Sequence, residues 1–498
     1  MYNLIFKLDP QLGTSLQGQV REMIVSAILD RSLQPGDRLP SSRELAEHLG
    51  LSRNTVTFAY RALQDDGYLI AKHRSGFYVS EDTAASDMAL ERRDKRHPSD
   101  GPSTPQSLRT DTVGWQNRLL SHYEDIRVLQ KPLNWLEYTY PFVYGQADQT
   151  LSNHSEWREC ARQALGLHNF GSTSGACGEH DDPLLVEYIR TRTLPARGII
   201  ASSDEILVTM GAQNALYLLA QLLVSDDSRV IIEEPTYPDL RDILRLRTKH
   251  LHSCPVDENG IILGGQDLTQ TDLVVITPSH QCPTTATLST DRRQDLLASA
   301  TRDDFLIIED DYEFEMNFLE KPAPALKSGD KDGRVLYVGS FSKSLFPGLR
   351  LGYLVAPAPV IKSARKLRHL MLRHPPGHLQ RTAAYFLALG HYDAQIRKLR
   401  RRLAARRAVM SEALAQVGLL DTQAAKFGGT SFWVYGPPNL DTTALAAQLA
   451  EQSVLIEPGA SFFFDETRRN AMRLAYSSIP ASKIPAGVDL VAKAIAGR

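Results

Sequence analysis

A single lysine lies among hydroxyl side chains between Ser340 and Tyr353, and an arginine follows at Arg350. The Lys343 amine could hold an aldehyde as a Schiff base. The hydroxyls of Ser340 and Ser342, together with the Arg350 guanidinium, could bind a phosphate on the same molecule. Most lysines in a Ser-x-Ser-Lys sequence are solvated, so this stretch needs partners elsewhere before it indicates a cofactor site.

A second phosphate-binding feature is expected upstream, where a strand-like run, residues 204–210, leads into an apolar helix-like run. The intervening turn contains Gly211, Ala212 and Gln213. The first N–H groups of a helix have no partner within it and lie at its positive end, so a phosphate can dock there without a charged side chain. An ordinary strand-to-helix turn explains this pattern equally well on its own.

Two further strand ends carry side chains suited to an aromatic ring. The strand-like run 229–234 precedes Tyr237, whose ring could stack on a flat heteroaromatic ligand or simply pack in the core. The run 305–309 precedes Asp310 and Tyr312, at the kind of strand end where α/β sheets bind ligands. A carboxylate there keeps a pyridine nitrogen protonated, and a phenol can hydrogen-bond a ring hydroxyl. Together these are the needs of pyridoxal 5′-phosphate, although an acidic cluster after a strand is often only a solvated turn.

These segments, in this order, resemble the fold-type I aminotransferases, which have an α/β fold. The resemblance assigns the Schiff base to Lys343, the pyridine nitrogen to Asp310 and the ring hydroxyl to Tyr312. It also extends to Arg473, which would grip the carboxylate of a substrate or effector in bidentate fashion. The chain departs from the enzyme pattern at Cys282, where aminotransferases usually carry an asparagine.

Residues 12–80 have a separate pattern. Apolar residues at helical intervals predict a helix over 16–29. A serine-capped helix ending at Gly50 and another beginning after Ser52 predict a helix-turn-helix, and 67–79 reads as two strands around a basic turn. These segments resemble the winged helix-turn-helix of GntR regulators, which is mainly α with a small β wing. The resemblance implies DNA contacts from Arg43, Ser52, Arg53, Thr55 and Gly76.

A chain of 498 residues is long enough for two domains. We predict the winged helix-turn-helix over 12–80, a flexible polar linker over 81–112 and the aminotransferase-like domain over 113–498. The first 80 residues carry nine Lys or Arg against eight Asp or Glu, so one copy should bind DNA weakly and an operator should supply repeated half-sites. A second basic stretch, 397–407, is interpreted as the solvated face of a long helix.

A helix-turn-helix joined by a linker to an aminotransferase-like domain is the layout of the MocR subfamily of GntR transcriptional regulators. The resemblance implies a cytoplasmic, head-to-tail homodimer that binds pyridoxal 5′-phosphate on Lys343. An amine or amino-acid effector would displace the lysine as an external aldimine and change binding to an operator in double-stranded DNA. His280, in a Ser-His-Gln sequence typical of MocR members, would help to hold the cofactor.

Two other functions stay open at this point. Lys343, Asp310 and Arg473 would also serve an active aminotransferase with a regulatory DNA-binding domain; turnover is not expected, although a half-transamination is chemically plausible. A cofactor-independent DNA-binding protein is the third reading. The effector is not named by the sequence. Arg473 indicates only an anionic group, while runs 371–376 and 386–391 are similar to MocR members that respond to taurine or to ectoine-derived diamino acids.

The remaining composition excludes several classes of protein. The four cysteines show no paired spacing, so neither a disulfide framework nor a metal site is expected at Cys160, Cys177, Cys254 and Cys282. No N-terminal apolar run, cleavage-type signal or long apolar span is apparent, so we expect a soluble, intracellular protein. The formal net charge of −2 is typical of a soluble cytoplasmic protein.

Overall fold

A computed structural model describes residues 15–72, 75–81, 118, 126, 131–145, 148, 151, 153–175, 180–318, 323–420, 428–464 and 470–497. The chain forms two compact units, an N-terminal unit (Met1–Leu120) and a C-terminal unit (Ser121–Arg498). The expected linker, 81–112, lies outside the described residues except for its first residue, and so does the basic turn of the expected wing, 73–74.

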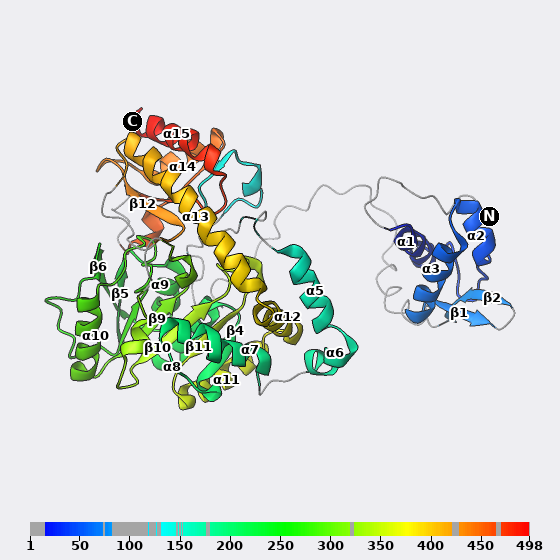
Figure 1. The fold of residues 1–498 in the computed structure, drawn as a ribbon, viewed down its shortest axis with the longest axis horizontal. Coiled ribbons are helices and arrows are strands. Elements are labelled where there is room, and N and C mark those ends of the chain that lie inside the picture. The colour runs from blue at the N-terminus through cyan, green and yellow to red at the C-terminus, as the bar shows by residue number, and fades with distance from the viewer. Residues whose placement is uncertain are drawn as a thin grey trace. The chain divides into compact units, whose positions relative to one another are not determined.

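The N-terminal unit has the helix-turn-helix and wing expected from the sequence (Figure 1), with elements α1 (Leu16–Leu29), α2 (Ser42–Leu49), α3 (Arg53–Asp65), β1 (Leu69–Lys72) and β2 (Gly76–Val79). Ser41 and Glu44 exchange hydrogen bonds at the start of α2, and Gly50 ends it in the left-handed conformation. Tyr60 of α3 is buried and donates to the Pro40 carbonyl over 2.9 Å. Apolar residues of all five elements form one core, so the predicted winged helix-turn-helix is confirmed.

The C-terminal unit is built on a large sheet whose described strands, in spatial order, are β4 (Ile206–Thr209), β11 (Gly352–Val355), β10 (Val335–Ser340), β9 (Leu306–Asp311), β8 (Leu273–Ile276), β5 (Arg229–Glu234), β6 (His250–Asp257) and β7 (Gly260–Ile261). Neighbouring strands are parallel except at β11 and β7, which are antiparallel to their neighbours. The carboxyl ends of β4, β5, β8, β9 and β10 therefore lie at one edge of the sheet.

Helices cover both faces of this sheet. One face packs against α8 (Ala212–Leu223), α9 (Pro238–Arg245) and α11 (Ala358–Leu372). The opposite face packs against α10 (Thr290–Asp303). A sheet buried on both faces explains why its central strands read as continuous apolar runs, and the predicted α/β architecture is confirmed.

The C-terminal part adds a second, antiparallel sheet in the order β12 (Ser431–Tyr435), β15 (Ala471–Ala475) and β14 (Glu457–Pro458). It lies with α14 (Thr442–Glu451), α15 (Ile484–Ala496) and the long α13 (His391–Gln416), which runs from this sheet towards α12 (Gly377–Ala388) (Figure 1). Strand β3 (Tyr140–Pro141) pairs in parallel with β13 (Val454–Leu455). This pairing joins the segment 131–145 to the C-terminal sheet region.

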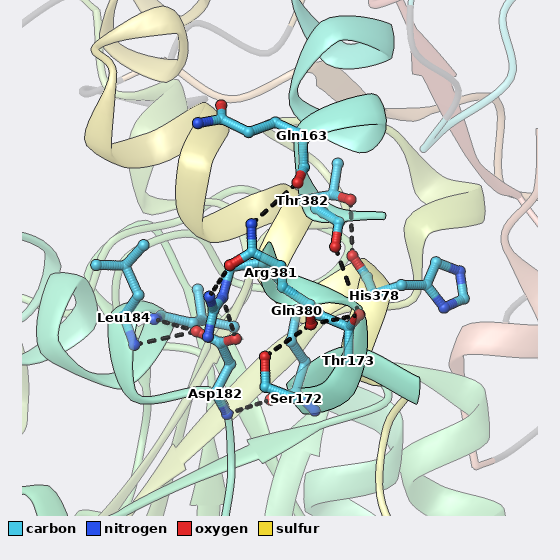
Figure 2. Close-up of polar contacts among 12 residues, drawn as sticks. Gln163, Ser172, Thr173, Asp182, Leu184, His378, Gln380, Arg381 and Thr382 are labelled. Carbon is cyan, nitrogen blue, oxygen red and sulfur yellow. Dashed lines mark hydrogen bonds and ion pairs between the residues drawn. The ribbon is translucent and has the colours of Figure 1, made fainter. Parts of the chain in front are cut away.

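The remaining α-helices of the described residues are α5 (His154–Ala164), α6 (Leu167–Ser174) and α7 (Pro183–Tyr188). Figure 2 shows how the start of α7 is fixed to α12: the Asp182 carboxylate accepts from Arg381 Nε over 2.6 Å and caps α7 at the Leu184 N–H. The Asp182 N–H donates to Gln380 Oε1 over 2.9 Å. The connection into α7 is thus held by polar contacts despite its irregular sequence.

The basic stretch on α13 differs from its interpretation as a solvated face. Arg406 and Arg407 are buried, and the Arg406 guanidinium pairs with Asp148. The Arg407 guanidinium lies 4.6 Å from the centre of the Phe432 ring. The interpretation is therefore wrong for these two arginines, which join α13 to neighbouring segments. Among the described helices, none is both long and apolar enough to span a membrane.

Candidate functional site

A cavity lies at the carboxyl edge of the large sheet, where the strands β9 and β10 end beside the start of α8. Its lining residues are Tyr144, Ala212, Gln213, Leu216, Tyr237, Cys282, Asp310, Tyr312, Ser340, Ser342, Lys343, Pro347 and Arg350. Segments far apart in sequence thus place most of the expected cofactor residues around one space. His280 and Arg473 are not among the lining residues.

The phosphate-binding features expected from the sequence meet at one end of this cavity. Gly211 precedes α8 with φ 83° and ψ 173°, a conformation essentially restricted to glycine. A Cβ at Gly211 would lie 3.6 Å from the Arg350 guanidinium carbon and 3.7 Å from Ser342 Oγ. Ser342 Oγ is buried without a hydrogen-bond partner among the described residues. Free helix N–H groups, a hydroxyl and a guanidinium therefore form a cradle that fits a phosphate.

Asp310 and Asp311 occupy opposite faces of β9, as successive strand residues do. Asp311 pairs with Arg197 over 2.7 Å, on the side away from the cavity. Asp310 lines the cavity, and its Oδ1 has no partner within the described part of the chain. Burial, with the charges of Asp311 and Glu233, raises the Asp310 pKa to about 8. A protonated ring nitrogen in the cavity would satisfy this carboxyl group.

The aromatic side chains expected around the ring also line the cavity. The Tyr237 hydroxyl donates to Asp239 Oδ2 over 2.7 Å, which fixes the ring at the start of α9. Burial raises the pKa of Tyr312 well above its usual value, so its phenol stays protonated and able to donate. The donors and the ring therefore fit a phosphorylated pyridine.

Lys343 and Arg473 both lie beside the Tyr144 ring. The Tyr144 ring centre is 4.1 Å from Lys343 Nζ and 3.9 Å from the Arg473 guanidinium carbon. Arg473 Nε donates to Glu457 Oε2 over 2.6 Å, and Arg473 NH1 approaches Cys282 Sγ at 3.9 Å. A reactive amine and an anion-binding group thus both lie within about 4 Å of the centre of one aromatic ring.

The buried His280 lies apart from this set. Neither ring nitrogen has a hydrogen-bond partner among the described residues, and burial lowers its pKa to about 4. The imidazole is therefore neutral near pH 7. The structure does not bring His280 to the cavity lining, so a contact with the cofactor stays a prediction.

The residues expected to contact DNA lie on the N-terminal unit at the start of α2 and α3 and at the wing. Ser52 caps α3: its hydroxyl accepts from the Thr55 N–H over 3.1 Å and lies 2.8 Å from Thr55 Oγ1. Arg43 and Arg53 are exposed, and Gly76 opens β2 with φ 110°. Both arginines are accessible to a nucleic acid, although Arg53 Nε also donates to Ser42 Oγ over 3.5 Å. Ser52 has a structural task as well.

Comparison with known proteins accounts for both units. The family model for bacterial regulatory proteins of the gntR family matches residues 16–79, and that for aminotransferase class I and II matches 185–490. The HTH-type transcriptional regulator TauR of Rhodobacter capsulatus is 49% identical over 98% of each chain. The probable rhizopine catabolism regulatory protein MocR of Rhizobium meliloti is 28% identical over 97% of this chain and 94% of its own. The chain belongs to the MocR subfamily of GntR regulators.

A solved structure supports the fold of the large unit of this MocR-type regulator. LysN, the α-aminoadipate aminotransferase of Thermus thermophilus, superposes with a TM-score of 0.70 at 24% identity, covering 77% of this chain and 99% of its own. The protein is a DNA-binding transcriptional regulator whose fold-type I aminotransferase-like domain binds pyridoxal 5′-phosphate. When bound, that cofactor supplies an aldehyde conjugated to a pyridine ring.

Sequence reasoning missed three side chains of this MocR site: Lys131, Tyr144 and Glu457. Lys131 and Tyr144 lie in the segment that follows the expected linker, and Glu457 is on β14. No local motif marks them. Their role depends on the pairing of β3 with β13 and of β14 with β15, which bring distant segments together.

Lys343 should react with pyridoxal 5′-phosphate faster as the pH rises to about 8, and no faster above it. Burial lowers its pKa from the usual value of 10.5 to about 8, although Glu313 acts in the opposite direction. Only the neutral amine attacks an aldehyde, so its reactive fraction falls about tenfold per pH unit below the pKa. The rate of appearance of the Schiff base in cofactor-free protein measures this. A rate that keeps rising to about pH 10, as for free lysine, would contradict the lowered pKa.

Proposed function

We propose that this MocR-type regulator senses an amino compound that carries an anionic group. The effector's amine takes the place of Lys343 on the cofactor, and its anionic group binds near Arg473. The proposal rests on the positions of Lys343 Nζ and the Arg473 guanidinium carbon, 4.1 Å and 3.9 Å from the centre of the Tyr144 ring. A molecule that binds both groups would contact the Tyr144 ring, so we expect its binding to favour a second arrangement of the segment 131–145, which leads back to the DNA-binding unit.

Within this proposal the predicted site residues have separate tasks. The phosphate is bound by Ser340, Ser342, Arg350 and the N–H groups at Gly211, Ala212 and Gln213. Asp310 binds the ring nitrogen, Tyr312 binds the ring hydroxyl and Tyr237 packs on the ring. All of these residues except Gly211, which directly precedes Ala212, line one cavity, and this convergence supports the assignments.

Taurine is our first candidate effector. It joins a primary amine to a sulfonate through a short chain, which suits the arrangement of Lys343 and Arg473. The similarity of runs 371–376 and 386–391 to taurine-responsive members, and the 49% identity to TauR, support this choice. An ectoine-derived diamino acid is the second candidate, because it also combines an amine with an anionic group, in this case a carboxylate.

We further propose a head-to-tail homodimer that acts on operator half-sites in the cytoplasm. Large apolar side chains are exposed on the C-terminal unit: Leu133 and Leu167 are fully exposed, and Phe170 is 52% exposed. Dimerisation would cover such residues and would present two DNA-binding units. The binding free energies of two weak half-site contacts would then add. Light scattering of the full chain measures the oligomeric state.

Effector sensing is tested on the full-length protein loaded with pyridoxal 5′-phosphate and bound to DNA selected from a random-sequence pool. Taurine, amino acids and a diamino acid are added singly while absorbance and DNA affinity are recorded. The proposal expects one compound to shift the absorbance band to a stable new position and to change DNA affinity at the same concentration. Conversion to pyridoxamine phosphate with release of a keto product or aldehyde would instead establish an active aminotransferase, which the named relatives do not favour.

Arg53→Ala should weaken DNA binding by about tenfold or more, and Arg43→Ala should act in the same direction. Each exposed guanidinium is expected to contact a phosphate or a base edge. Where the contact is to a phosphate, the slope of log affinity against log salt concentration should also fall by about one. Arg61→Ala, at an exposed position later on α3, is the matched control and should leave binding unchanged. Equal losses in Arg53→Ala and Arg61→Ala would contradict the docking of the start of α3 on DNA.

A further inference from the structure

A second cation, Lys131, lies beside the proposed effector site. Lys131 Nζ is 3.7 Å from Glu457 Oε1 and donates a hydrogen bond to the Tyr144 carbonyl. A Cβ at Gly145 would lie 3.6 Å from Lys131 Nζ and 2.5 Å from Lys343 Nζ. Both amines therefore lie near Gly145, and Lys131 is close to the amine that an effector would replace.

The charges around Arg473 show what this second cation does. Arg473 is already paired with Glu457, and the two side chains are only 4% and 8% exposed. A buried pair of this kind is neutral, so an anionic group entering beside it would bring an uncompensated charge, which is costly away from water. Arg473 alone therefore does not make the site attractive to an anion.

Burial lowers the Lys131 pKa, and the nearby Glu457 carboxylate acts in the opposite direction. With Lys131 in its charged form, two cations share the single carboxylate of Glu457. The site keeps one positive charge, which a singly charged sulfonate or carboxylate would neutralise. The other nearby carboxyl group, Glu313, accepts a hydrogen bond from Thr430 over 2.6 Å and interacts with Lys343 as well as Arg473. Burial raises the Glu313 pKa, which favours its neutral form and limits its effect on the charge around Arg473.

We propose that Lys131 is a specificity-determining residue of the effector site. With Arg473 and against Glu457 it sets a net charge of about +1, and so selects amines that carry one negative charge over uncharged amines. This inference rests on the proposed function, because it concerns the same effector.

The test compares taurine and β-alanine, which carry an anionic group, with 2-aminoethanol, which does not. Dissociation constants are measured by absorbance titration of the cofactor-loaded, full-length protein. Lys131→Met should weaken binding of taurine and β-alanine by about tenfold to a hundredfold, as expected for a lost charge-assisted contact. Binding of 2-aminoethanol should stay within about threefold, and Lys131→Arg should keep most of the affinity for taurine.

The double variant Lys131→Met with Glu457→Gln separates charge from structure. Without the Glu457 carboxylate, the positive charge of Arg473 is no longer compensated within the protein. Taurine binding should therefore recover by about tenfold relative to Lys131→Met alone. A double variant that binds taurine no better than Lys131→Met does would overturn this inference, and so would a Lys131→Met protein that binds taurine like wild type. Either result would leave the proposed function standing. If the wild-type spectrum responds to no amine, the proposed function fails and this inference fails with it.

Discussion

Lys343→Ala is expected to abolish the visible absorbance that a Schiff base between the protein and pyridoxal 5′-phosphate produces. Among the described residues, Lys343 is the lysine that lines the cavity, and its lowered pKa makes it reactive near neutral pH. Absorbance spectra of the purified variant, with added cofactor and without amines, measure the loss. Lys366→Ala, at an exposed position on α11, is the control and should keep the full band.

The same variant should also respond differently to amines. Exchange with a lysine-bound aldehyde is faster than direct reaction of an amine with a free aldehyde, so any spectral response of Lys343→Ala should become slower. The DNA affinity should no longer change on the time scale seen with wild type. A visible band that persists in Lys343→Ala without added amine would show that another lysine holds the cofactor, and Lys131 would be the first candidate by its position beside Gly145.

The parts of the site that could be predicted from sequence depend on short stretches of chain. Gly211 stands between a strand and a helix, and Asp310 ends an apolar strand, so local patterns place both at the carboxyl edge of a sheet. The caps at Ser41 and Ser52 are likewise local and mark where α2 and α3 begin. In each case the residues that decide the structure lie within a few positions of one another.

The parts that were missed depend on contacts between distant segments. Tyr144 faces Arg473 only because β3 pairs with β13 and β14 pairs with β15. The pairing of Glu457 with both Lys131 and Arg473 has the same origin. These contacts also change the interpretation of Arg473. The sequence suggests a free anion-binding group, whereas in the structure Arg473 belongs to a buried cluster of charged side chains.

The error on α13 has a related cause. Arginine has a long apolar stem and a charged end, so it can be buried wherever a carboxylate, carbonyl or aromatic ring meets the guanidinium. Arg406 pairs with Asp148, and the Arg407 guanidinium lies over the Phe432 ring. Both partners lie on other segments of the chain, so the spacing of residues within the helix does not predict these contacts. A run of basic residues therefore does not by itself predict a solvated face.

Gly211→Ala is the second substitution expected to have a large effect, and it tests the phosphate cradle. The backbone conformation of Gly211 is essentially restricted to glycine, so a side chain there costs about 1–3 kcal/mol. The added methyl group would also lie 3.6 Å from the Arg350 guanidinium and 3.7 Å from Ser342 Oγ, the groups expected to bind the phosphate. Loss of the phosphate contacts should weaken cofactor binding by about a hundredfold or more, measured by titration of cofactor-free protein.

Gly265→Ala separates the loss of the cradle from backbone strain. Gly265 also has a positive φ, 87°, but a Cβ there would have no atom within 4 Å. Both variants should lower the unfolding temperature, whereas only Gly211→Ala should lose the cofactor. Equal cofactor affinity in the two variants would mean that the phosphate does not lie against Gly211. The start of α8 would then not be the phosphate site, and Ser340, Ser342 and Arg350 would have to bind the phosphate in another arrangement.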